Sequence, residues 1–104
     1  MSAAPIPAND ELRVAALREY DILDTPPEAS FDRITRLACQ LLDVPMSVVS
    51  LVDKDRQWFK SCVGVRVTET SRAPSFCAYT ILSDSMLNVP DATRDERFSR
   101  RNWR

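Results

Sequence analysis

The sequence predicts an α+β fold in which helices flank an antiparallel sheet. Two segments with helical periodicity come first, over residues 10–22 and 28–42. Two segments of strand character follow, over residues 46–52 and 57–63, and only four polar residues separate them. Because the helices and the strands come in separate runs, an antiparallel sheet is favoured over a parallel one.

Both predicted helices have recognisable ends. Asn9 or Asp10 can cap the first helix, and Thr25-Pro26-Pro27 stops it. Val44-Pro45 ends the second. The first helix repeats apolar residues at helical spacing, namely Leu12, Ala16, Tyr20 and Leu23. The second carries one apolar stripe, formed by Phe31, Ile34, Leu37, Ala38, Leu41 and Leu42.

The two predicted strands read as a hairpin. Residues 46–52 are rich in valine, residues 53–56 make a polar turn, and residues 57–63 form the second strand. Strand alternation places Trp58, Lys60 and Cys62 on one face, and it places Phe59, Ser61 and Val63 on the other.

The remaining elements are short. Residues 64–74 read as a loop and residues 75–82 as a short helix. Residues 86–89 predict a short strand that Pro90 stops. Beyond it we expect a polar loop with a weak helix around Glu96.

The composition excludes several kinds of site. The 104 residues suffice for one small domain, and they include no histidine and only one glycine, Gly64. Without histidine there is no Ser-His-Asp triad and no His-ligated metal site. With one glycine there is no GxGxxG motif and no P-loop.

Charge and cysteine content favour a cytoplasmic protein. The net charge of −1 gives no general attraction to nucleic acid or to an anionic membrane. Five arginines fall in the last eleven residues, as a solvated basic end or a phosphate-binding arm. No signal peptide or membrane-spanning run is present in the sequence. An odd number of cysteines, three, fits free thiols in a reducing compartment.

Several motifs, in order along the chain, resemble a bacterial subgroup of the GAF domain family. They are Leu17–Glu28 (LREYDILDTPPE), Phe31–Ala38 (FDRITRLA), Val49–Asp53 (VSLVD), Arg56–Ser61 (RQWFKS), Ser75–Ala78 (SFCA) and Val89–Ala92 (VPDA). The resemblance covers about residues 9 to 98 and implies a GAF-like antiparallel sheet with flanking helices.

The Ala/Pro-rich composition of residues 1–9 predicts a flexible N-terminal lead, and the resemblance implies a partial GAF domain (10–98) followed by a non-matching basic tail (99–104). Members of the family continue for several more strands. We therefore expect a sheet that is incomplete at its C-terminal side, in a chain that is a truncated product or a fragment. The strand at 46–52 would then present unpaired backbone groups at an edge.

The resemblance implies a sensory or regulatory input module. Members of this subgroup are similar to sensor histidine kinases, diguanylate cyclases and related regulators, so an output domain is expected in a longer parent protein. GAF domains bind small ligands, sometimes cyclic nucleotides or tetrapyrroles, and many dimerise. The resemblance identifies no ligand or cofactor for this chain, and no catalytic or metal-binding residue is assigned.

Two alternative functions remain open. The first is a thiol-dependent enzyme, similar to GAF-type methionine sulfoxide reductases, which need suitably placed cysteines. The second is an interaction fragment that pairs through its sheet edge or its first helix. We expect the chain not to be an enzyme.

The resemblance also places candidate site residues. Ligand-pocket candidates are Trp58, Phe59, Phe76, Cys77 and Tyr79. Tyr79 stands where the family commonly has a histidine, and a phenol cannot serve as a neutral-pH base. Cys77 is either a pocket thiol or a small buried hydrophobe. The residues Leu12, Ala16, Tyr20 and Leu23 either join a dimer interface or pack onto their own domain.

Overall fold

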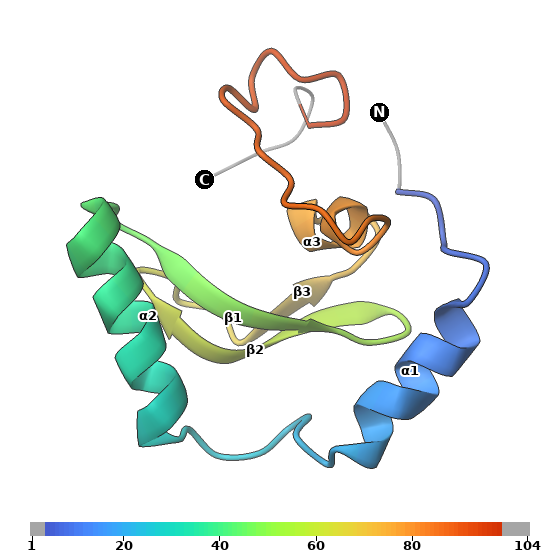
Figure 1. Cartoon of the computed structure of the whole chain (residues 1–104), viewed down its shortest axis with the longest axis horizontal. Helices are drawn as coiled ribbons and strands as arrows, with labels where there is room; N and C mark the ends of the chain where they lie inside the picture. The colour runs from blue at the N-terminus through green and yellow to red at the C-terminus, as the bar shows by residue number, and fades with distance from the viewer. Residues whose placement is uncertain (1–3, 99–104) are drawn as a thin grey trace.

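The fold combines helices with a three-stranded antiparallel sheet, so the predicted α+β class is confirmed (Figure 1). It comes from a computed structural model that describes residues 4–98. The predictions made for residues 99–104 lie outside this range.

Helix α1 spans Asp10–Glu19 and helix α2 spans Ala29–Leu42. They lie at opposite ends of the sheet, and the connection between them passes below it in Figure 1. Helix α1 ends three residues before the predicted end at residue 22. The reason is local, because Asp21 and Asp24 adopt left-handed backbone conformations with φ of 51° and 62°. Leu23 therefore lies outside the helix.

The C-terminus of α2 follows a left-handed capping pattern. Asp43 has φ of 51°, and the Val44 N–H donates to the Cys39 carbonyl at 3.2 Å. This bond satisfies a carbonyl that the helix itself leaves open.

Strands β1 (Ser47–Val52) and β2 (Arg56–Val63) form the predicted antiparallel hairpin. A third strand, β3 (Glu69–Ser71), pairs with β2 and was not predicted, because the sequence at 64–74 reads as a loop. These three polar residues show no strand pattern in the sequence. They form a strand because they pair with β2.

A bulge in β2 overturns the predicted assignment of its faces. The register shifts by one residue, and Lys60 has no partner on β1. Trp58 pairs with Leu51, and Ser61 pairs with Val49. Because Leu51 and Val49 share a face of β1, Trp58 and Ser61 share a face of β2. The prediction that they lie on opposite faces is wrong.

Polar contacts dock α2 on the sheet. Thr35 is 1% exposed, and its Oγ1 lies 2.8 Å from Ser61 Oγ. Ser61 also donates to Asp32 Oδ1 at 2.6 Å. Much of the predicted apolar stripe is exposed instead, at Ile34, Leu37, Leu41 and Leu42. The helix was predicted correctly, but within the described residues its apolar side is largely uncovered.

Helix α3 spans Phe76–Thr80, inside the predicted segment 75–82. Ser75 caps it by accepting a hydrogen bond from the Ala78 N–H at 3.1 Å. The predicted strand at 86–89 is wrong, since these residues pair with no strand of the described chain. The weak helix expected around Glu96 is also absent, and turns take its place.

The sheet order is β1-β2-β3, so β1 lies at an edge. Within residues 4–98, its outer backbone groups have no strand partner. The predicted exposed edge at 46–52 is therefore present in the fold.

The N-terminal lead contacts the connection between β3 and α3. Ala4 is 6% exposed, and its N–H donates to the Ala73 carbonyl at 3.1 Å. Nearer to α1, the Asp10 N–H donates to the Pro7 carbonyl at 3.1 Å.

None of the helices among residues 4–98 has the length and the apolar composition that a membrane span requires.

Candidate functional site

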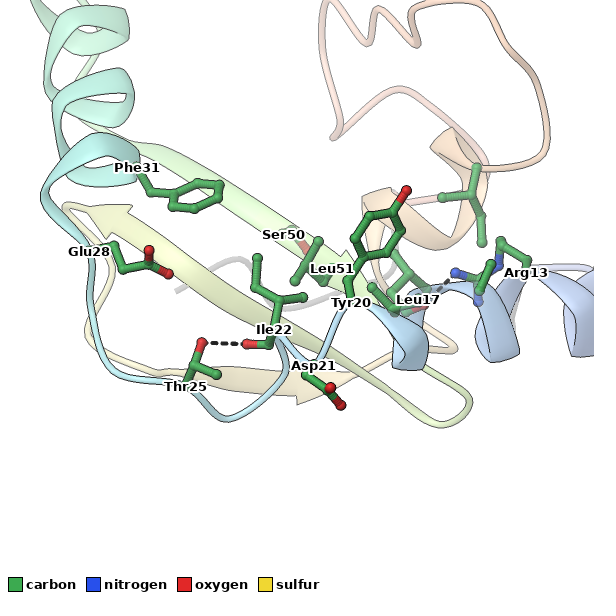
Figure 2. A pocket seen from close by; sticks show the side chains of 13 residues that line it. Arg13, Leu17, Tyr20, Asp21, Ile22, Thr25, Glu28, Phe31, Ser50 and Leu51 are labelled. Carbon is green, nitrogen blue, oxygen red and sulfur yellow. Dashed lines mark hydrogen bonds between the residues drawn. The ribbon is translucent and has the colours of Figure 1, made fainter.

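The principal candidate site is a cavity of about 670 Å³ between α1, the α1–α2 connection and β1 (Figure 2). Three consecutive residues of β1, Ser50, Leu51 and Val52, line it. Successive strand residues point to opposite faces, so this cavity follows the free edge of β1. Its other lining residues are Arg13, Ala16, Leu17, Tyr20, Asp21, Ile22, Thr25, Glu28, Phe31 and Ile81.

The walls of this cavity are largely apolar. Figure 2 shows Leu17, Tyr20 and Ile22 along one side, and Phe31 from the first turn of α2 at the far end. The volume lies within the usual range for small-molecule sites, roughly 300–1,000 Å³. The site therefore suits a ligand with an apolar or aromatic body.

The polar groups in the walls are mostly engaged within the chain. Arg13 donates to the Val52 carbonyl and to Asp10, the latter at 3.0 Å. Thr25 donates to the Ile22 carbonyl. One buried nitrogen of Arg13, Nη2, has no hydrogen-bond partner in the described chain. Arg13 is thus a cationic group at this site with a donor that a ligand could use.

The five predicted pocket residues lie elsewhere, and none lines this cavity or the second cavity described below. Phe76 and Tyr79 pack on Phe98, with ring centroids 4.2 and 5.2 Å apart. Phe98 is fully buried, and the Arg97 guanidinium lies 5.6 Å from the Tyr79 ring centre. These aromatic rings fill the space beside α3 with each other.

The other three pocket candidates are spread over the sheet and α3. Trp58 is 7% exposed and belongs to the core. Phe59 pairs with Ser50 and is partly buried. Cys77 is a partly buried free thiol.

The predicted interface residues on α1 are mostly exposed. Leu12 is 76% and Tyr20 is 80% exposed, and Ala16 is exposed as well. Leu23, beyond the helix, is partly buried. Ala16 and Tyr20 line the principal cavity, whereas Leu12 lines a second cavity of about 840 Å³ beside the N-terminal segment.

A charge cluster lies at the β1–β2 turn, and sequence reasoning missed it. Asp10 receives two hydrogen bonds of 2.8 Å from Arg72, which also donates to the carbonyls of Asp53 and Lys54. The Arg72 side chain is 3% exposed. These hydrogen bonds join the start of α1 to the hairpin turn.

The cluster shifts the titration of its carboxyl groups. Hydrogen bonds from Arg72, supported by Arg13, lower the pKa of Asp10 to about 2 against the opposing effect of burial. Burial is the largest single influence on the pKa of Asp53 and acts to raise it. Hydrogen bonds from Lys54 and Arg56 and the charge of Arg18 outweigh burial, so the pKa of Asp53 is lowered.

Lys60 fixes the α1–α2 connection and was also missed. Its side chain is fully buried, and Nζ lies 2.7 Å from both Thr25 Oγ1 and the Pro26 carbonyl. It also pairs with Glu28 at 2.6 Å. The available signal was a lysine within a strand and a threonine-proline segment upstream, but no local pattern in the sequence links the two.

The thiols lie on different elements, with Cys39 on α2, Cys62 on β2 and Cys77 on α3. All three are free and partly buried. Residues 4–98 contain no group of three or more metal-ligating side chains.

Comparison with known proteins gives two findings. The GAF domain family matches residues 26–104. A cyclic di-GMP phosphodiesterase of Pseudomonas aeruginosa is 34% identical over 98 residues, which are 94% of this chain and 17% of that protein. The activity in that name therefore describes a much longer protein than the part matched here.

Proposed function

Because the chain belongs to the GAF domain family, as its motifs predicted, we propose that it is the sensory input module of a bacterial signalling protein. In this proposal the principal cavity binds a small ligand, and the bound state biases an output domain of a longer parent. The observation that carries it is the apolar cavity of about 670 Å³ beside the free edge of β1.

The similarity to the phosphodiesterase supports one class of output. We propose that the parent protein makes or degrades cyclic di-GMP, and that this chain supplies its regulation rather than its chemistry. The GAF match of residues 26–104 supports this division.

A melting-shift screen on residues 1–104 tests ligand binding. Cyclic nucleotides, including cyclic di-GMP, and tetrapyrroles are the first probes. A ligand at one hundred times its Kd stabilises the native state by about 2.7 kcal/mol. For a domain of this size we expect a rise in Tm of about 10–20 °C.

Matched variants place the site. Ala16 lines the principal cavity, and Ala15 lines the second one. Ala16→Phe fills the first cavity and should abolish the shift, whereas Ala15→Phe should keep it. Loss of the shift in Tyr79→Ser alone would move the site to the aromatic cluster beside α3. No shift with any probe would contradict small-ligand sensing.

A second candidate function is dimerisation through α1. It is favoured by the exposure of Leu12 on α1 and of Tyr20 directly after it, because this helix packs little against its own domain. Light scattering over a range of concentrations should then give a mass that rises toward twice that of one chain. Leu12→Arg should hold the mass at one chain, and a constant single-chain mass in the unmodified protein would refute dimerisation.

A further inference from the structure

Helix α1 is held against the domain by little apolar contact. Val14 is its one buried apolar side chain in the part of the chain described. Leu12 and Tyr20, which are much larger, are 76% and 80% exposed. Burial of apolar area is the usual force that fixes a helix on a domain, and here that force is small.

Charged side chains of α1 make up much of the rest of its attachment, and among them Arg13 donates to the Val52 carbonyl. The lead before the helix is also attached, because the Ala4 N–H donates to the Ala73 carbonyl at 3.1 Å. Asp10, in its first turn, forms the paired 2.8 Å hydrogen bonds with Arg72. Arg18, near its end, donates to Asp53 at 3.2 and 3.3 Å. The Asp10–Arg72 pair is the better shielded, with side chains 12% and 3% exposed, whereas Arg18 is 58% exposed. Shielded, two-point ion pairs are the strong ones.

The chain after α1 is fixed independently of the helix. Arg56 holds Asp24 through two hydrogen bonds of 2.8 and 2.7 Å. Lys60 holds the next residues, from Thr25 to Glu28. The residues between the helix and these anchors are Tyr20 to Leu23, and Asp21 in this segment and the anchored Asp24 both have positive φ. A short segment that absorbs such backbone angles has the character of a hinge.

We infer that α1 is a hinged arm, which pivots at residues 20–23 and is latched at its N-terminal end by the Asp10–Arg72 ion pair. Release of the latch moves Arg13 and Leu17 away from β1 and so removes one wall of the principal cavity. The effect on ligand binding rests on the proposed function, whereas the latch itself does not.

Hydrogen exchange on the unliganded chain 1–104 tests the latch without any ligand. Asp10→Asn removes the charge that Arg72 binds. We expect amides of α1 to exchange at least about tenfold faster, because breaking one side of a shielded pair is costly. Amides of β2 should keep their rates. Glu11→Gln makes the same charge change in the same helical turn, and Glu11 forms no ion pair within residues 4–98, so this variant should leave α1 unchanged.

A milder variant covers the case in which Asp10→Asn fails to fold. Arg18 is largely exposed, so Arg18→Gln leaves the core intact and should speed exchange in α1 by about twofold to fivefold. Equal acceleration of α1 and β2 would show that α1 unfolds only with the whole domain and would overturn the hinge. Unchanged α1 rates in both variants would overturn the latch. Either failure leaves ligand binding to be judged by the melting-shift screen.

Discussion

At the scale of single residues, backbone positions with positive φ shape this fold. Gly64 has φ of 75° in the connection that follows β2. A Cβ built there would lie far inside van der Waals contact of the Pro45 carbonyl oxygen. The residue is thus glycine for two reasons, its backbone angle and the close approach of the segment that precedes β1.

Replacing this glycine should be costly. We expect Gly64→Ala to lower the free energy of unfolding by about 2–4 kcal/mol, because the backbone around Pro45 must shift to accommodate the methyl group. Urea denaturation measures the change. Asp43→Gly is the control, since it removes a Cβ at another left-handed position, where φ is 51°, and so measures the backbone-angle cost alone. If Gly64→Ala costs no more than Asp43→Gly gains, the close contact with Pro45 is not limiting.

At the scale of elements, α2 meets the sheet through a buried polar cluster of Asp32, Thr35 and Ser61. Each hydroxyl has a partner, so burial leaves neither unsatisfied. Ser61 connects the two α2 residues, and it lies on their side of the sheet only because of the β2 bulge. The packing of α2 on β2 therefore depends on both the bulge and the cluster.

Removing the central hydroxyl should loosen this contact. We expect Ser61→Ala to cost about 1–3 kcal/mol, because it leaves the Asp32 carboxylate without its donor beside a fully buried Thr35. Chemical denaturation provides the measurement. Ser71→Ala, at an exposed position of β3, should change stability by less than about 0.5 kcal/mol. A cost for Ser61→Ala as small as this control would argue against the cluster.

At the scale of the whole molecule, the charge cluster holds together elements that a larger apolar core would otherwise hold together. The buried apolar side chains of residues 4–98 are Ala4, Val14, Val52, Trp58, Ala78 and Phe98. Ion pairs and hydrogen bonds instead connect α1, the hairpin turn and the α1–α2 connection, elements that are far apart in sequence. Stability should therefore depend on pH more steeply than in a domain with a large apolar core.

The fall in the free energy of unfolding at acid pH should depend on Asp10. Its pKa is held at about 2 by Arg72 and Arg13, below the usual value of about 3.9 for an unfolded chain. Its contribution is thus complete above about pH 4 and is lost as pH falls toward 2. We expect the wild type to lose about 2 kcal/mol more than Asp10→Asn over this interval in urea denaturation.

The comparison with Asp10→Asn is needed because another carboxyl titrates in the same range. Hydrogen bonds from Arg97 hold the pKa of Asp95 at about 2 as well. Asp95 is present in both proteins, so the difference between their curves isolates Asp10. Parallel curves between pH 4 and 2 would mean that the Asp10–Arg72 pair adds no stability.

The sequence by itself determined the elements that local signals encode. Periodicity predicted α1, α2, β1 and β2 to within a few residues, and the motifs along the chain predicted the family. The Thr25-Pro26-Pro27 segment correctly separated the helices. These features depend on residues that are neighbours along the chain, and a sequence displays such neighbours directly.

Only the tertiary structure decided the features that depend on pairing. β3 exists because β2 offers it backbone partners, and residues 86–89 form no strand because no described strand pairs with them. The bulge at Lys60 reassigned the faces of β2. The cavity draws on α1, the connection, β1 and Ile81, and of the candidates named from sequence only Ala16 and Tyr20 line it. Hydrogen bonding between strands and the meeting of distant side chains are set by the path of the whole chain, which no local pattern specifies.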